Sequence, residues 1–169
     1  MALLPILRYP DPRLYKKAAP IERVDEAVRR LAADMAETMY AAPGIGLAAT
    51  QVDVHIQLVV IDASEDRSHL LTLINPRILS AEGEQLGEEG CLSVPGMTGR
   101  VPRYTRIRYT AVDHEGNRID RVAEGFHARV VQHECDHLDG ILYPMRVTDF
   151  SRFGYTSVLF PELDPAADD

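Results

Sequence analysis

One segment constrains this chain more than any other: the five residues HECDH at positions 133–137. On a helix, at about 100° per residue, His133 and His137 lie one turn apart on the same face and can bind one metal ion. Glu134 projects about a quarter turn away, where its carboxylate can reach a water molecule beside that ion. The pattern H-E-x-x-H therefore favours a metal-dependent hydrolase, although two histidines with purely structural contacts would show the same spacing.

Two helices are predicted. In residues 126–138, which contain the motif, the apolar residues do not alternate, and Asp139-Gly140 behind them is a typical helix stop. In residues 25–40, apolar side chains recur at three- and four-residue steps, as on one face of an amphipathic helix. We expect the helix over 126–138 to be central, because the predicted strands precede and flank it in runs.

Strands are predicted in three places. Residues 56–62 and 70–75 are rich in β-branched and apolar side chains, and residues 106–124 contain a turn, DHEGN, between two strand-like runs. Because these strands come in runs, we expect an α+β fold with mainly antiparallel sheets around a central helix carrying the HExxH motif. With 46% apolar residues in 169, a single catalytic domain over 1–169 is expected, with a flexible acidic end at about 162–169.

The charge and the N-terminal sequence exclude several classes of protein. A formal charge of −8 argues against direct binding to nucleic acid or to anionic lipid. No apolar run approaches the roughly 18 residues that a membrane span needs, and the N-terminal segment has no basic leader before an apolar stretch. We therefore expect a cytoplasmic protein whose two cysteines, Cys91 and Cys135, are free thiols or metal ligands.

A catalytic site of this type needs a third protein ligand. The longer pattern H-E-x-x-H-x-x-G-x-x-H would require a histidine as third ligand where this chain has Tyr143. A glutamate ligand further along the chain would have to be Glu162, which lies in an apparent tail. We favour Cys91, because EEGCLSVPG is expected to be a loop-like, glycine-flanked segment in which a thiolate can approach the ion. A buried cysteine that only packs is the alternative.

Cys135 is not expected to join the site. It lies two residues from each histidine, so it points to the opposite side of the helix, where Val131 and Leu138 are available for packing. Two imidazoles and one thiolate would leave one position open for a water molecule, whose pKa falls to about 7 on a catalytic ion.

Three segments, taken together and in this order, resemble the peptide deformylase family: GIGLAATQ at 44–51, EGCLS at 89–93 and QHECDHLDG at 132–140. VPRY at 101–104 fits as well, so the likeness extends over most of the chain, to about residue 147. The resemblance implies an enzyme that removes the formyl group from the N-terminal formylmethionine of nascent proteins and releases formate.

The resemblance also implies roles for individual residues. Glu134 would activate the attacking water and pass its proton to the departing amine, while the side-chain amide of Gln51 and the backbone N–H of Leu92 would stabilise the oxyanion. The implied metal ligands are Cys91, His133 and His137. The implied substrate-binding residues are Ile45, Gly46, Leu47, Phe126 and Val130.

The same resemblance implies a cofactor and partners. The cofactor would be one divalent ion, Fe(II), with zinc, nickel or cobalt able to replace it. The substrate would be an N-formylmethionyl peptide, and a transient association with the ribosome follows from that substrate. Because GFHARVVQHE resembles the subclass that includes organellar deformylases, an organellar origin stays open beside a bacterial cytoplasmic one.

Some positions depart from the commonest bacterial pattern of the family. Thr98 stands where many relatives carry an arginine near the peptide, and Arg129 stands where an apolar pocket residue is common. Glu89 and Asp136 are expected to pair with Arg103 and to brace the segment that carries Cys91.

The residues alone leave two other functions open. A zinc endopeptidase of the H-E-x-x-H type would need a third ligand other than Cys91. A metal-binding or interaction protein on the same scaffold would need no catalysis, although every expected catalytic residue is present.

Overall fold

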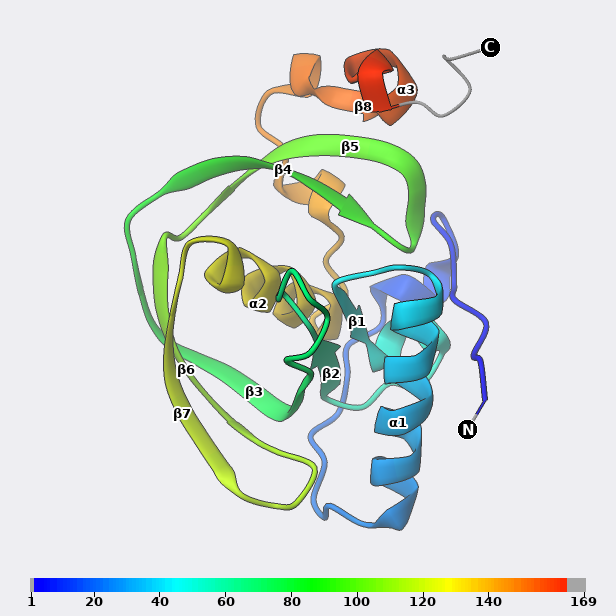
Figure 1. Ribbon diagram of the computed structural model, residues 1–169, viewed down its shortest axis with the longest axis vertical. Coiled ribbons are helices and arrows are strands. Elements are labelled where there is room, and N and C mark those ends of the chain that lie inside the picture. The colour runs from blue at the N-terminus through cyan, green and yellow to red at the C-terminus, as the bar shows by residue number, and fades with distance from the viewer. Residues whose placement is uncertain (1, 164–169) are drawn as a thin grey trace.

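The computed structural model describes residues 2–163, which form helices packed on two antiparallel sheets (Figure 1). The helices are α1 (Glu26–Ala41), α2 (Gly125–Leu138) and the single turn α3 (Thr156–Leu159). Short 3₁₀ helices are Pro12–Tyr15, Ala49–Val52, Tyr143–Arg146, Phe150–Arg152 and Pro161–Leu163. The strands are β1 (Gly46–Ala48), β2 (Leu58–Ile61), β3 (Leu71–Glu82), β4 (Gln85–Cys91), β5 (Val94–Arg103), β6 (Arg106–Val112), β7 (Arg118–Glu124) and β8 (Phe153–Tyr155).

The strands form a five-stranded sheet in the order β1-β2-β3-β6-β7 and a three-stranded sheet in the order β4-β5-β8. Every strand pair in them is antiparallel. Helix α2 lies between the β4–β5 hairpin and the larger sheet in Figure 1. The expectation of an α+β fold with antiparallel sheets around a central helix is thereby confirmed.

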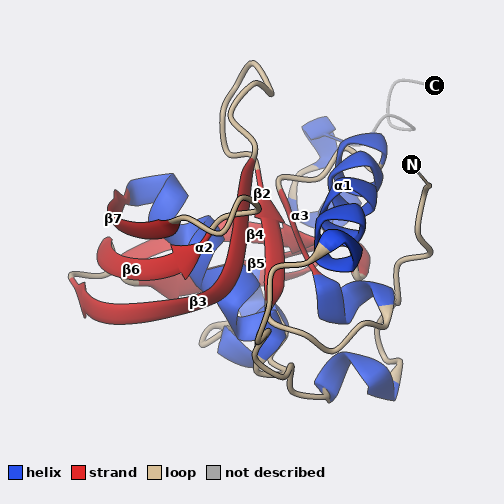
Figure 2. Cartoon of the chain, turned by 90° about the horizontal axis from the view of Figure 1, so that it is seen from below, coloured by secondary structure: helices blue, strands red, loops and turns tan. Residues whose placement is uncertain are grey.

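Strand β2 is buried on both faces, because each face of the sheet is covered by a different helix. Val59 and Ile61 belong to a core cluster that includes residues of α2, whereas Leu58 and Val60 belong to a cluster with Met35 and Met39 of α1. Successive side chains of a strand point to opposite faces, so a continuous apolar run is what this position requires. Figure 2 shows α1 on one side of the central strands and α2 on the other.

Local sequence signals set the ends of both long helices. The side chain of Asp25 accepts a hydrogen bond of 3.0 Å from the backbone N–H of Val28 and so caps the start of α1. Behind α2, Gly140 has a φ of +76°, and a Cβ atom there would lie 2.4 Å from the carbonyl oxygen of Tyr15. Only glycine fits this position, which both ends the helix and lets the N-terminal segment pass beneath it.

The predicted helices and the predicted hairpin agree with the structure, but the sheet is larger than predicted. Strand β3 continues to Glu82, beyond the predicted end at residue 75, and β1, β4, β5 and β8 were not predicted. The expectation of a loop-like segment around Cys91 is wrong, because β4 runs through Cys91 and β5 begins at Val94. Glycine, proline and charged residues in β4 and β5 hide the alternation by which strands are recognised.

Within residues 2–163, no helix is both long and apolar enough to cross a membrane. The predicted acidic end at 162–169 lies mostly outside the described residues. Its first residue, Glu162, is exposed in the last 3₁₀ helix.

Candidate metal centre

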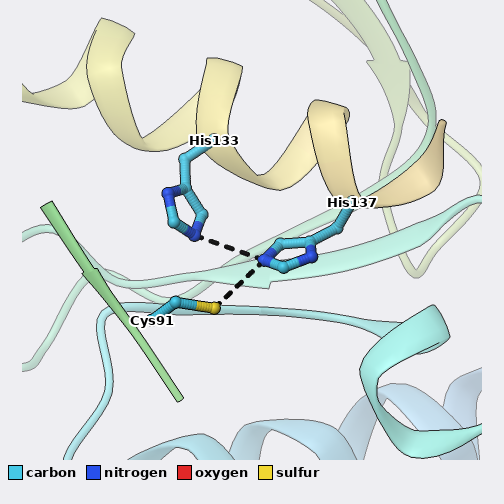
Figure 3. A group of neighbouring side chains, drawn as sticks. All are labelled: Cys91, His133 and His137. Atoms are coloured by element: carbon cyan, nitrogen blue, oxygen red, sulfur yellow. Dashed lines mark hydrogen bonds between the residues drawn. The ribbon is translucent and has the colours of Figure 1, made fainter. Parts of the chain in front are cut away.

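Two structural elements bring together the three predicted metal ligands. His133 and His137 lie one turn apart on α2, and Cys91 is the last residue of β4, which faces the helix. Figure 3 shows the three side chains pointing toward one another. Nε2 of His137 lies 3.3 Å from Sγ of Cys91 and 3.3 Å from Nε2 of His133, and the donor atoms of all three lie within 4.8 Å of one another.

These separations fit a small metal ion. In a tetrahedral site with metal–nitrogen distances of about 2.0–2.1 Å, two imidazole nitrogens lie roughly 3.3 Å apart. Among the described side chains, the carboxylate oxygen Oε2 of Glu134 is buried without a hydrogen-bond partner, next to the ligands. A thiolate and two imidazoles are a donor set for an ion with one open position, and the unsatisfied carboxylate lies next to them.

The imidazole of His133 is held in one orientation by Glu89. Oε1 of Glu89 lies 2.7 Å from Nδ1 of His133, which leaves Nε2 of the ring for Cys91 and His137. Burial on its own raises the pKa of Glu89, but hydrogen bonds from Arg103 and His133 outweigh that effect and lower the pKa to about 2. Glu89 is therefore an ionised carboxylate that fixes the ring nitrogen facing the ion.

The predicted pairing of Arg103 with both carboxylates is present. Arg103 donates to Glu89 through Nε and Nη2, each at 2.9 Å, and to Asp136 through Nη1 at 2.6 Å. Asp136 also accepts from Arg146 on the surface. Arg103 thus connects β5, β4 and α2 beneath the metal centre, as a buried and fully paired charge.

Arg129, one of the two residues expected to depart from the family pattern, also contacts this network. The side chain is buried, and its Nη1 donates to Oε2 of Glu89 at 2.5 Å and to the carbonyl oxygen of Val101 at 2.9 Å. The guanidinium charge is therefore satisfied by the hairpin. The sequence pattern marks the residue as unusual but does not reveal these contacts.

The electrostatics of the site separate the roles of its titratable groups. Burial raises the pKa of Glu134 to about 7, although the charge of His133 acts in the opposite direction. Burial and the nearby charge of His133 lower the pKa of His137. For His133, hydrogen bonds with Cys91 and Glu89 outweigh burial and raise the pKa, so an ion that binds Nε2 must displace a proton from this ring.

Gln51 is fixed with its amide nitrogen toward the metal centre. Its Oε1 accepts a hydrogen bond from the backbone N–H of Ala48, and its Nε2 lies 3.0 Å from Oγ of Ser93 and 3.6 Å from Sγ of Cys91. The backbone N–H of Ser93 also donates to Sγ of Cys91. Two N–H donors thus point at the sulfur, an arrangement suited to a thiolate. Ser93 was missed, because a serine in a turn carries no distinguishing sequence signal.

A cleft of about 840 Å³ opens above these residues. Of the predicted oxyanion and substrate-binding residues, Gln51, Leu92, Ile45, Gly46, Phe126 and Val130 all line it. Leu47 does not: its side chain is fully buried in the core cluster beneath α1. Alternate residues of a strand face opposite sides, so Leu47 faces the core.

Three residues weighed as metal ligands lie outside the cluster. Cys135 packs against the core that includes Val131 and Leu138, as predicted, and burial raises the pKa of its thiol to about 12. Tyr143 is buried with its ring stacked on His133 at a centroid distance of 6.1 Å, so it packs on a ligand. Among the described residues, the candidate metal-binding group includes neither of these residues nor Glu162.

Thr98, the other residue expected to depart from the family pattern, lies in β5. It pairs with Gly154 across β5 and β8, and its Oγ1 lies 2.6 Å from Oγ1 of Thr156. Both threonines line the cleft. The segment after residue 150 therefore contributes to the wall of the candidate site.

Known proteins support one family for this architecture. A family model described as "Polypeptide deformylase" matches residues 3–153. The chain is 54% identical over 172 residues to "Peptide deformylase 2" of Bordetella bronchiseptica, with 96% of this chain and 98% of that relative covered. It also matches a crystal structure of a peptide deformylase from Legionella pneumophila, with a TM-score of 0.84, 41% identity and 89% of each chain covered.

A Met-Ala-Ser-bound crystal structure of a class I type b peptide deformylase from Acinetobacter baumannii matches at a TM-score of 0.81 and 33% identity, with 86% of this chain and 98% of that chain covered. The matched residues include all three candidate ligands. Because the likeness extends over nearly the whole chain and includes the candidate metal centre, the chain belongs to the peptide deformylase family.

Proposed function

We propose that Cys91, His133 and His137 hold a divalent ion and that Glu134 is the general base in removing the formyl group from N-formylmethionyl peptides. Deformylation is the activity of the family, and the assignment of its steps to these residues is the proposal. The observation that carries it is the convergence of one thiol and two imidazoles within 4.8 Å, beside a buried carboxylate at the base of a cleft.

A divalent ion, when bound, supplies a Lewis acid that polarises a carbonyl group and lowers the pKa of water. We infer Fe(II) as the natural ion from the family resemblance, and the donor set also suits zinc, nickel or cobalt. Glu134 accepts the proton of the attacking water and passes it to the departing amine. Burial raises the pKa of Glu134 to about 7 in the metal-free protein, and a bound cation favours the carboxylate form that accepts this proton.

The amide of Gln51 and the backbone N–H of Leu92 are the proposed donors to the charge that develops on the formyl oxygen. Gln51 is held by its bond to Ala48, so its Nε2 needs no reorganisation at the moment of reaction. Leu92 follows the proposed ligand Cys91 directly in the turn of the hairpin. Fixed donors of this kind typically contribute about 10²–10³-fold to the rate.

The peptide is proposed to bind as an added strand between the two sheets. Strand β1 pairs only with β2, and β4 pairs only with β5, so each has one unpaired edge within the described sheets. Both border the cleft, through Gly46 and through residues 88–91. The carbonyl oxygen of Ile45 accepts a hydrogen bond from the backbone N–H of Asp62, so the backbone groups of Ile45 face the β2 side. Because the backbone groups of successive residues in an antiparallel strand face opposite sides, those of Gly46 face the cleft.

The methionine side chain is proposed to lie against Ile45, Phe126 and Val130. Ile45 and Phe126 are 39% and 51% exposed and line the cleft, which leaves their apolar surface available to a ligand. The similar structure from Acinetobacter baumannii binds Met-Ala-Ser, a tripeptide with a free N-terminal methionine. A product of this type supports the proposed arrangement.

We further infer that the protein acts in the bacterial cytoplasm, where formylated nascent chains are made, with a transient association with the ribosome and no direct contact with nucleic acid. The net charge of −8 supports the last point. The substrate chemistry supports the first two.

The test is to incubate anaerobically purified protein with formyl-Met-Ala-Ser and to measure formate and free amine. We expect stoichiometric release of both, and a loss of at least about 10³-fold in Glu134→Gln. The matched control is Glu162→Gln, an exposed glutamate that should leave the rate unchanged.

Three results would contradict the proposal. Full activity in Glu134→Gln would exclude it as the base, and unchanged metal content in Cys91→Ala would favour a different third ligand. Hydrolysis of an unformylated internal peptide bond at a comparable rate would instead support an endopeptidase.

A further inference from the structure

The proposed metal ligands come from two separate elements, so contacts between these elements must set the geometry of the site. Cys91 is on the β4–β5 hairpin, whereas His133 and His137 are on α2. Arg129 precedes the two histidines at the same four-residue interval and therefore shares their face of the helix.

The side chain of Arg129 joins α2 to both strands of the hairpin. Its Nη1 donates to the carbonyl oxygen of Val101 in β5, and its Nη2 donates to that of Gln85 in β4 at 3.3 Å. A Cβ atom on Gly87 would lie 3.0 Å from Cζ of Arg129, so β4 has a glycine where the guanidinium packs. The arginine and this stretch of strand fit one another closely.

The same guanidinium fixes the carboxylate that orients His133. Oε2 of Glu89 accepts from Nη1 of Arg129 at 2.5 Å and from Nε of Arg103 at 2.9 Å, while Oε1 faces Nδ1 of His133. The two arginines thus approach Glu89 from different elements, Arg103 from β5 and Arg129 from α2. Arg129 ties the carboxylate directly to the helix that carries His133, whereas Arg103 reaches that helix through Asp136.

We propose that Arg129 is a positioning residue for the metal centre: it holds Glu89 and strand β4 against α2 so that Cys91 and His133 converge on one ion. This inference rests on the proposed metal ligands. Without Arg129, the Arg103–Glu89 pair still neutralises the buried charge, so the fold is retained while the carboxylate and the hairpin gain freedom. The loss therefore appears in metal affinity and coordination.

The experiment is a titration of the metal-free protein with Co(II) under anaerobic conditions, which reports both affinity and coordination. The absorption bands of a cobalt–thiolate site measure whether Cys91 and the two histidines bind the ion together. The variants are Arg129→Met, which keeps an unbranched apolar stem, Arg129→Lys, which keeps the charge, Glu89→Gln, and the double variant Arg129→Met/Glu89→Gln.

We expect Arg129→Met to weaken cobalt binding roughly 10- to 100-fold and to alter the thiolate band, as substitutions next to metal ligands do. Arg129→Lys should recover only part of the cobalt affinity, because an ammonium group keeps the charge but cannot replace all the donors of a guanidinium group. The double variant should bind cobalt no more weakly than the weaker single variant, because the two residues act through one another. Arg108→Met, which removes an exposed arginine paired with Asp120, should bind like the unaltered protein.

Three outcomes would overturn the inference. Unchanged cobalt affinity and spectrum in Arg129→Met, with only a lower melting temperature, would give Arg129 a purely structural role. Losses that add in the double variant would show that Arg129 does not act through Glu89. If Arg129→Met fails to fold, Arg129→Lys is the variant that tests the inference. Full cobalt affinity in Arg129→Lys would show that the several donors of the guanidinium are not needed to position the site.

Failure of the metal assignment itself has a different signature. If the unaltered protein binds cobalt without a thiolate band, both the proposed ligands and the role of Arg129 are rejected. A normal thiolate band in both the unaltered protein and Arg129→Met rejects the role of Arg129 but leaves the proposed ligands in place.

Discussion

Gly46 lies so close to Glu134 that a Cβ atom on the glycine would be 2.6 Å from Oε1 of the carboxylate. The same Cβ atom would lie 2.8 Å from Cδ and 2.9 Å from Cγ, so the whole end of the glutamate would have to move. Glu134 is buried and has little room to do so. The proposed substrate-binding strand and the proposed base are thus fitted to each other.

Gly46→Ala should therefore lower kcat/KM for formyl-Met-Ala-Ser by about 10²-fold, because a displacement of about 1 Å at a reacting group has that effect. The measurement is steady-state kinetics with the metal content determined in parallel. Gly154→Ala is the matched control, since a Cβ atom there meets no atom within 4 Å. Equal activity of both variants would contradict the fitted arrangement.

Glu134→Gln should stabilise the metal-free protein at alkaline pH while abolishing activity. Burial raises the pKa of Glu134 to about 7 from its ordinary value of 4.5. Between these two values the unfolded chain loses the proton and the folded chain keeps it, so folding stability falls as the pH rises and stays reduced above about pH 7. A neutral glutamine removes this loss.

The expected gain at about pH 8 is on the order of 3 kcal/mol in the free energy of unfolding, and it should vanish near pH 4. Urea unfolding of the metal-free proteins at the two pH values measures it. Glu65→Gln, an exposed loop variant, should show no such dependence. A gain of equal size at both pH values would show that the ionisation of Glu134 is not its cause.

The activity of the metal-loaded enzyme should fall on the acid side of its pH profile. Glu134 accepts a proton only as a carboxylate, and a nearby cation favours the carboxylate and lowers its pKa below the value of about 7 in the metal-free protein. We expect kcat/KM to decline with a midpoint below 7 when it is measured from about pH 5 to about pH 9. A decline in kcat/KM with a midpoint above pH 7 would show that a group other than Glu134 causes the loss of activity on the acid side.

Removal of the ion should abolish activity and lower stability, and the two cysteines should differ in both respects. A ligand present at about 100 times its dissociation constant stabilises the folded state by about 2.7 kcal/mol. Melting curves with and without Co(II) should show this gain in the unaltered protein and in Cys135→Ala, and should lose it in Cys91→Ala. Cys135 is the matched control because it lies in the same helix as both histidines but packs into the core.

The helix that carries the motif, and the direction of its side chains, could be predicted from the sequence alone. Helical geometry is local: the predicted helix over 126–138 lies at Gly125–Leu138, and the spacing alone placed His133 and His137 together and Cys135 away from them. The hairpin at residues 106–124 was predictable for the same reason, since its turn and its alternation are both local patterns.

The path by which Cys91 reaches the helix depends on contacts between distant elements and could not be predicted from the sequence. Strands β4 and β5 were not predicted, because their glycines, prolines and charged residues hide the strand pattern. Those residues are there for non-local reasons: Gly87 makes room for Arg129, and Glu89 accepts hydrogen bonds from Arg103 and Arg129 while it orients His133. A buried ion-pair network joins side chains far apart in the sequence, and its burial is set by packing between elements, which no local periodicity encodes.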